Sequence, residues 1–120
     1  MHLEARLAEP DVVISLTGHG PDGTGQRRMA TVLVSNKGTT VAREVECGLA
    51  LDGKEYQAGN GGIPSRLPAL GPGEEVRWGV LVNESTLAEL RIGQRRIEDA
   101  MTPWVRFTDK LGNRHEWFAS

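Results

Sequence analysis

The residues that could do chemistry begin with a glycine-rich stretch near the N-terminus. Gly18, Gly20 and Gly23 have the G-x-G-x-x-G spacing of a dinucleotide-binding fingerprint and directly follow an apolar run. That fingerprint works only where a helix starts at the glycines, because the first N–H groups of the helix must meet a pyrophosphate. Pro21 and Gly25 stand where such a helix would have to form, and a strand pattern follows soon after. We therefore interpret the stretch as a flexible loop and expect no cofactor.

Metal ligation would require histidine and cysteine at close spacing. His2, His19 and His115 are far apart in the chain, and Cys47 has no ligand partner near it. We expect His115, on the same strand face as Trp117, to be a partly buried structural residue, and His19 to lie exposed in a loop. Cys47 is on the apolar face of a strand, where a cysteine behaves as a small buried hydrophobe. No metal site is predicted.

Potential catalytic groups are present, but their spacing does not suit catalysis. Glu74-Glu75 and Glu98-Asp99 are adjacent carboxylate pairs, and neighbours on a strand point to opposite faces instead of forming an acid–base couple. No serine occupies a Gly-x-Ser-x-Gly nucleophile elbow. Arg91, Arg95 and Arg96 could bind a phosphate, although a solvated surface with acidic neighbours is the favoured interpretation. We predict that the chain is not an enzyme.

An aromatic pair near the C-terminus is the remaining candidate for a site. A four-residue turn after Thr108 places Trp104 opposite Phe118, and Arg106 opposite Glu116, on one otherwise polar face of a hairpin. Cover of the pair by residues 58–73 is favoured over exposure. If the pair is exposed, it is the best partner-binding patch of the chain, because aromatic side chains dominate interface energetics.

Length and charge are those of a small globular domain. A chain of 120 residues has the usual size of one sandwich or small barrel. Its 14 basic and 16 acidic residues are interspersed and give a formal net charge of −2, whereas a nucleic-acid partner usually requires a clustered basic surface. No apolar run approaches the ~20 residues of a membrane span, and the N-terminus lacks a signal-peptide core. We expect neither nucleic-acid binding nor membrane insertion, and the chain could be cut from a longer protein.

Two long strands, within residues 29–51, organise the rest of the sequence. Both alternate apolar and polar residues with the period of two that is typical of a strand. A tight turn at Asn36-Lys37-Gly38 joins them. The residues expected to share the core face are Ala30, Val32 and Val34 in the first strand, and Val41, Val45, Cys47, Leu49 and Leu51 in the second.

Shorter strands are predicted on both sides of this pair. They cover residues 11–17, an edge strand at 54–57 after the Asp52-Gly53 turn, residues 74–82, and a closing hairpin of 103–108 and 114–118. Residues 58–73 read as irregular, and Thr86 with Glu89 has capping-box spacing, which predicts a short helical turn near 86–90. Residues 1–10 form an N-terminal arm or linker remnant, and 11–120 form an all-β, two-sheet antiparallel sandwich of about seven strands.

Three segments resemble bacterial immunoglobulin-like domains of the CARDB and NEW-type classes. Residues 32–42 are similar to their strand with an Asn-x-Gly turn, residues 67–75 to their Leu-x-Pro-Gly-Glu entry to a later strand, and residues 105–113 to their closing hairpin. The resemblance implies an immunoglobulin-like sandwich and an extracellular or envelope-exposed location. The chain lacks the acidic, Asn-Asn ending of CARDB domains, so a calcium or adhesion role is not carried over.

The expected function is therefore that of a non-catalytic protein-interaction or spacer domain, the soluble end of a larger bacterial protein. The alternative is a structural or assembly protein, such as a phage or surface component, that associates through strand edges. A hydrolase or small-ligand-binding domain is the least favoured. A protein partner is expected, and the oligomeric state is left open by the sequence.

Overall fold

The computed structural model describes residues 10–21, 23, 26–51, 54–59, 66–83 and 101–119, which form β-strands and no helix. In chain order these strands are β1 (Val12–Pro21), β2 (Arg27–Asn36), β3 (Ala42–Leu51), β4 (Lys54–Gln57), β5 (Leu67–Leu70), β6 (Glu75–Asn83), β7 (Thr102–Thr108) and β8 (Arg114–Phe118). Within this part of the chain there is no helix long and apolar enough to cross a membrane.

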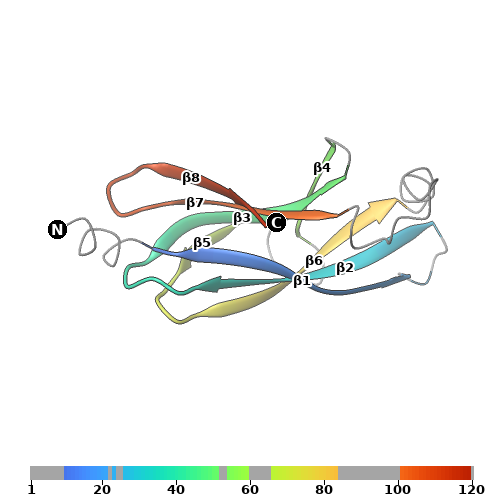
Figure 1. The fold of residues 1–120 in the computed structure, drawn as a ribbon, viewed down its shortest axis with the longest axis horizontal. Helices are drawn as coiled ribbons and strands as arrows, with labels where there is room; N and C mark the ends of the chain where they lie inside the picture. The colour runs from blue at the N-terminus through green and yellow to red at the C-terminus, as the bar shows by residue number, and fades with distance from the viewer. Residues whose placement is uncertain are drawn as a thin grey trace.

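The strands form two antiparallel sheets that lie one above the other (Figure 1). One sheet has three strands in the order β1-β2-β6, and the other has five, with β4-β3-β7-β8 as its main path and β5 also paired to β3. The expected all-β, two-sheet sandwich is confirmed at this level. The predicted helical turn near 86–90 and nearly all of the N-terminal arm lie outside the described residues.

The core between the sheets follows the alternation of the strands. Ala30, Val32 and Val34 of β2 are all fully buried, as predicted. On β6, Trp78, Val80 and Val82 are buried too, and Val76 packs against the core at its rim. On β3 the core-facing residues that were predicted, Val45, Cys47, Leu49 and Leu51, are buried. These residues meet across the gap because each strand presents every second side chain to the same face.

The prediction that a tight turn joins β2 to β3 was incomplete, since the two strands belong to different sheets. The link between them is fixed by the buried side chain of Asn36. Its Nδ2 donates to Thr40 O and Leu70 O, both at 2.9 Å, and its Oδ1 accepts from Gly38 N at 3.0 Å and from Asp11 N at 3.3 Å. One amide thus joins four segments where the chain changes sheets, and all of its hydrogen-bonding capacity is used.

A β-bulge in β3 shifts the face that Val41 was expected to share. The register between β3 and β7 slips between Arg43 and Glu46, and Glu44 has a positive φ of 49°. The extra residue puts both Ala42 and Val45 on the buried side, while Val41 is 38% exposed. Placing Val41 in the core was therefore wrong, because the bulge changes the phase of the alternation.

Two segments predicted as irregular contain strand. β1 continues past Leu16 to Pro21, with His19 opposite Ala30, so the expected flexible loop is partly strand with one register shift between Leu16 and Gly18. Leu67–Leu70 pairs with β3 as β5, and Leu70 is buried. The glycines and prolines of both segments hid the pairing, and β5 also depends on a partner strand, β3, far away in the sequence.

Candidate functional site

The β7–β8 hairpin has the register that the sequence predicts. Trp104 lies opposite Phe118, Arg106 opposite Glu116, and Phe107 opposite His115. Asp109 N donates to Asn113 O at 2.9 Å, and Gly112 has the positive φ of 86° that this turn requires. The hairpin forms one side of the five-stranded sheet, so its two faces and its outer edge are the surfaces to consider.

Asp109 and His115 fix the turn of this hairpin. The carboxylate of Asp109 accepts from Leu111 N and Asn113 N, both at 2.9 Å, and contacts His115 Nε2 at 2.8 Å. The hydrogen bond to His115, followed by that from Asn113, lowers the pKa of Asp109 to about 2. The His115 ring stacks on Phe107, with 5.1 Å between ring centroids. His115 is thus partly buried, as expected.

The favoured cover of the aromatic pair is confirmed for Trp104, which is only 1% exposed, but Phe118 is 46% exposed. An exposed patch centred on Trp104 is therefore wrong. The Trp104 ring lies over Gly48, where a Cβ would come within 2.8 Å of Trp104 Cζ2. The guanidinium carbon of Arg106 lies 4.3 Å from the ring centroid on a cation–π contact. Trp104 lies on the outer face of the sheet, where Gly48 on the neighbouring strand and the guanidinium of Arg106 cover its ring. Trp104 is unable to contact a partner directly.

Arg106 and Glu116, the other polar members of the predicted patch, are adjacent as expected. Arg106 Nε donates to Glu116, and Arg106 Nη2 donates to Glu55 Oε1 at 2.8 Å. The hydrogen bond to Glu116 is the main reason that the pKa of Arg106 is raised. The two carboxylates hold the guanidinium in place above Trp104, so this ion pair closes the cover over the indole ring.

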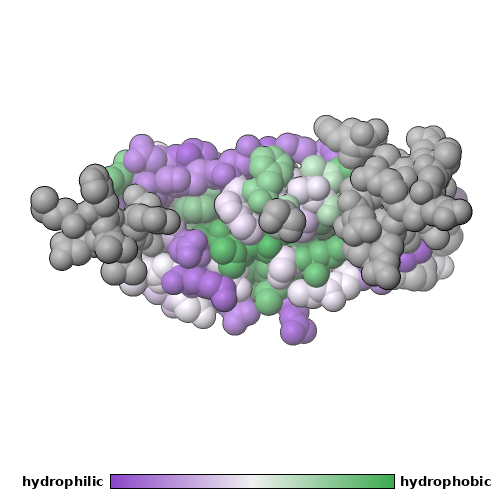
Figure 2. Space-filling model, viewed as in Figure 1, coloured by the Kyte–Doolittle hydropathy of each residue, from purple (hydrophilic) through white to green (hydrophobic). Residues whose placement is uncertain are grey.

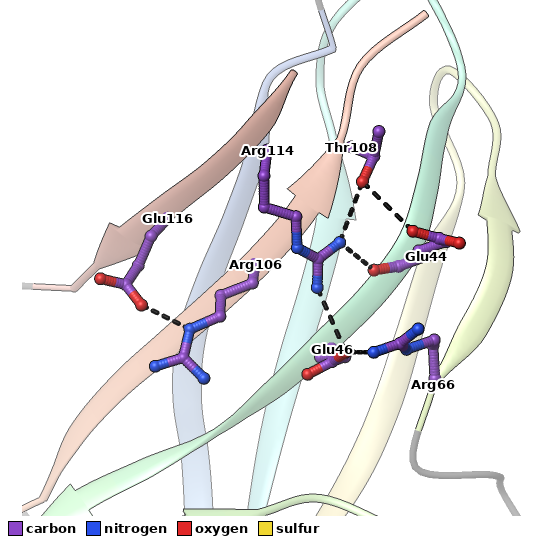
Figure 3. Close-up of polar contacts among 7 residues, drawn as sticks. All are labelled: Glu44, Glu46, Arg66, Arg106, Thr108, Arg114 and Glu116. Carbon is purple, nitrogen blue, oxygen red and sulfur yellow. Dashed lines mark hydrogen bonds and ion pairs between the residues drawn. The ribbon is translucent and has the colours of Figure 1, made fainter. Parts of the chain in front are cut away.

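A second charged cluster lies beside the first, on the same face (Figure 3). Glu46 is buried and bonds to Arg66, and it also contacts Arg114 Nη2 at 3.2 Å. Arg114 Nη1 donates to Glu44 O at 2.6 Å and to Thr108 Oγ1 at 3.1 Å. The bulge in β3 turns the Glu44 carbonyl toward Arg114, and the cluster thereby ties β8 to β3 across β7.

An open hollow of ≈770 Å³ lies between the bulge and the β7–β8 turn. Arg43, Glu44 and Arg66 line one side of it, and Lys110 and Leu111 of the turn line the other. Within the described part of the chain, the side chains of Arg43 and Lys110 make no hydrogen bond or ion pair. The carboxylates of Glu44 and Asp109 also line the hollow, so its charge is mixed, and Leu111 is exposed beside it.

The hydrogen bonds of the hairpin decide which backbone groups of β8 face its open edge. Asp109 pairs with Asn113, and Ala119 N donates to Pro103 O at 2.8 Å. Hydrogen-bonded and non-hydrogen-bonded pairs alternate along an antiparallel ladder, and the register between these two points has no shift. Odd-numbered residues of β8 therefore bond to β7. The N–H and C=O groups that point outward belong to the even-numbered ones: Arg114, Glu116 and Phe118.

The open edge of β8 also carries exposed aromatic residues. Trp117 is 40% and Phe118 46% exposed, on opposite faces of the strand. β8 ends the five-stranded sheet, with no further strand beyond it among the described residues. Figure 2 shows apolar residues reaching the surface in the middle of the view, between the two sheets. The edge thus combines unpaired backbone groups with apolar area.

The remaining sequence candidates do not converge on a site in the structure. His19 lies on β1, in the other sheet from the β7–β8 hairpin, and contacts Arg28 Nη1 at 3.1 Å. Cys47 is buried, and desolvation raises the pKa of its thiol far above the ordinary value. Among the described residues, no three histidine, cysteine, aspartate or glutamate side chains gather as metal ligands would. His2, Arg91, Arg95, Arg96 and the Glu98-Asp99 pair lie outside the described residues.

Sequence reasoning missed the residues that shape this surface. Glu44 and Glu46 are two apart on one strand, and that spacing could have indicated a carboxylate face. Glu55 and Arg66 join the clusters from β4 and from the segment before β5, and no local pattern connects them to Arg106 or Glu46. The outward direction of the β8 backbone could have been deduced from the predicted turn and register.

Comparison with known proteins gives a fold and no family. No family model matches the chain, and no curated protein matches it significantly. A solved structure of the putative ApaA protein from Bordetella pertussis is 16% identical with a TM-score of 0.51, covering 92% of this chain and 89% of that one. A protein from Archaeoglobus fulgidus is 13% identical with a TM-score of 0.47, covering 91% and 90%. At these identities the likeness concerns the fold alone, which the Bordetella structure supports.

Proposed function

We propose that the chain is a non-catalytic, immunoglobulin-like interaction domain that binds an extended segment of a protein partner along the free edge of β8. The observation that carries the proposal is the edge itself. The backbone groups of Arg114, Glu116 and Phe118 point outward, beside the half-exposed rings of Trp117 and Phe118. An added strand would satisfy those backbone groups, and the rings would provide apolar contact.

The strand order supports the immunoglobulin-like part of the proposal. β1, β2 and β6 correspond in order to strands A, B and E of an immunoglobulin sandwich, and β3, β7 and β8 to strands C, F and G. The turn motifs that resemble CARDB and NEW-type domains lie at the ends of these strands, at residues 36–38, 71–74 and 109–112. They favour a spacer or interaction module over an enzyme.

The charged clusters on the outer face support the same function in a different way. Arg106 and Arg114 each bond to carboxylates on other strands of the same sheet, which fixes the position of β8 before any partner arrives. Binding to a strand that is already held in place loses little conformational entropy. The carboxylates of Glu46, Glu55 and Glu116 are engaged by arginines, which suits a role in positioning better than one in proton transfer.

A proline substitution separates the outward backbone from the side chains. Glu116→Pro removes one outward N–H without removing a hydrogen bond to β7, and proline is tolerated on edge strands for this reason. Glu116→Ala is the matched control, because it also loses the bond to Arg106 but keeps the N–H. Circular dichroism would establish that both variants fold.

The test is a phage-displayed library of extended peptides selected against the wild-type chain. Enriched peptides should bind Glu116→Ala within a few-fold of wild type and lose about tenfold or more in affinity for Glu116→Pro, as expected when one backbone hydrogen bond is lost and the edge is blocked. Peptides that bind both variants equally, or a library that yields no binder, would contradict the proposal.

A further inference from the structure

We infer that the strand which adds to β8 is β8 of a second copy of the chain, so that two molecules join their five-stranded sheets edge to edge about a two-fold axis. This inference rests on the proposed function, because it uses the same edge and names its occupant. The structure supplies three arguments: the direction of the backbone groups, the order of charges along β8 and the surface left on both faces.

The backbone restricts a symmetric antiparallel pair to a few registers. Because the two-fold axis keeps each face of the sheet, one residue must lie opposite its own copy. In a register centred on His115, Arg114 of each copy lies opposite Glu116 of the other. Both residues have outward N–H and C=O groups, so each of these two pairs closes two backbone hydrogen bonds. In a register centred on Glu116, the pairs are Glu116 with its own copy and Arg114 with Phe118.

The charges favour the register centred on His115. It places a guanidinium opposite a carboxylate twice, and opposite charges on directly paired residues stabilise a sheet. The other register places Glu116 against Glu116, and like charges in direct opposition are destabilising. Glu116 and Arg114 side chains are 44% and 38% exposed, so both keep free surface for a second partner beside their bonds to Arg106 and Glu46.

The charge order also explains why a second copy fits this edge. Arg114, His115 and Glu116 read positive, neutral and negative, and an antiparallel copy reads the reverse. The strand is therefore complementary to itself. The chain carries a formal net charge of only −2, so two copies repel each other weakly. On the other face, Trp117 of one copy would lie beside Asn113 of the next, which reduces the exposure of its ring.

Cysteine cross-linking reads the register directly. His115 would face its own copy in a non-hydrogen-bonded pair, in which Cα atoms are ~4.5 Å apart, within the range that a disulfide spans. The variant His115→Cys should form a covalent dimer under mild oxidation, whereas Arg114→Cys should not. The wild-type chain is the control, since its single cysteine, Cys47, is buried and should give no dimer.

Charge exchange tests the pairing without a cross-link. Sedimentation velocity over a concentration series should show a reversible dimer for the wild-type chain. Arg114→Glu and Glu116→Arg should each weaken the dimer by about tenfold or more, because both cross-pairs become repulsive. An equimolar mixture of the two variants should associate again, since the heterodimer places a glutamate opposite an arginine at both cross-pairs.

A wild-type chain that stays monomeric at high concentration would overturn the inference, as would equal cross-linking at positions 114 and 115. Neither result bears on peptide binding. If library peptides still distinguish Glu116→Pro from Glu116→Ala while the chain is monomeric, the proposed function holds and the occupant is a different protein. If the chain dimerises but Glu116→Pro dimerises equally well, the dimer uses another surface and the inference is overturned, while peptide binding to the β8 edge is still decided by the library test.

Discussion

The edge strands β1 and β8 end the two sheets in different ways. β1 is ten residues long, and its pairing with β2 shifts between Leu16 and Gly18. Its apolar residues Val12 and Ile14 are buried in the core. β8 has five residues, pairs with β7 in an unshifted register, and leaves Trp117 and Phe118 half exposed. The β1 edge thus has an irregular register and buries its apolar side chains in the core. The β8 edge has a regular register and leaves apolar side chains at the surface.

The difference between the β1 and β8 edges indicates which of the two can accept another strand. A bulge twists an edge and interrupts its row of backbone groups, and natural sheets use this to prevent edge-to-edge pairing. β1 has such a bulge, whereas β8 has none. The arginine clusters hold β8 regular from its outer face. Substitutions at residues that stabilise the β1 edge or the β8 edge measure how much each residue contributes to its edge.

The largest effect is expected from the two aromatic residues that face each other in the β7–β8 hairpin. Trp104→Ala should lower the free energy of unfolding by ~3–5 kcal/mol, because the ring is fully buried and leaves a cavity. Phe118→Ala, at the opposite position, should cost about 1 kcal/mol or less because the ring is half exposed. Urea denaturation of both variants measures the difference, and similar losses would show that Phe118 is also a core residue.

A smaller loss is expected at the anchor of β1. Asn36→Ala removes four hydrogen bonds and leaves the Leu70 carbonyl buried without its donor, which should cost about 2–4 kcal/mol. Asn36→Asp should be at least as destabilising, since it keeps an acceptor for Gly38 N but turns a carboxylate oxygen toward two carbonyls. Lys37→Ala, at the exposed neighbour, is the control. An Asn36→Ala variant as stable as this control would mean that water replaces the amide.

The smallest effect is a pH dependence at the turn that supports β8. The folded-state pKa of Asp109 is lowered to about 2, so its contribution to stability is present above the ordinary aspartate pKa of ~3.9 and is lost as the pH falls toward 2. Thermal unfolding from pH 6 to pH 2 should show wild type more stable than Asp109→Asn at pH 6, with the gap closing at the acid end. If the stability difference between wild type and Asp109→Asn stays constant with pH, the charge of Asp109 does not contribute to stability.

Much of the sandwich could be predicted because its signals are local. The alternation of Ala30, Val32 and Val34 predicted a buried strand face, and the Asp109–Gly112 turn fixed the register of the closing hairpin. The bulge at Glu44 could not be predicted, since no local preference of glutamate indicates a positive φ. For the same reason Val41 was placed on the wrong face. β5 escaped notice because its pairing depends on β3, more than twenty residues away.

The candidate site shows the same division. Opposition of Arg106 to Glu116 followed from the hairpin, and the structure confirms it. Cover of Trp104 was favoured from the sequence, but by residues 58–73. The cover from Gly48 on another strand and from the rotamer of Arg106 could not be predicted. Glu55 completes that cover from β4. The pairing within one hairpin can be predicted from a short stretch of sequence. Whether a side chain on the face of the sheet is covered depends on which strands the topology places side by side.

The burial of Cys47 gives the chain a built-in reporter of its own opening. The thiol lies between the sheets, and burial raises its pKa far above the ordinary value, so a thiol-reactive dye encounters almost no thiolate while the sandwich is closed. Labelling can proceed only in molecules whose sheets have transiently separated. Its rate therefore follows the population of that open state under native conditions, without denaturant. A partner strand that stabilises the closed sandwich would slow the labelling of a residue it never touches.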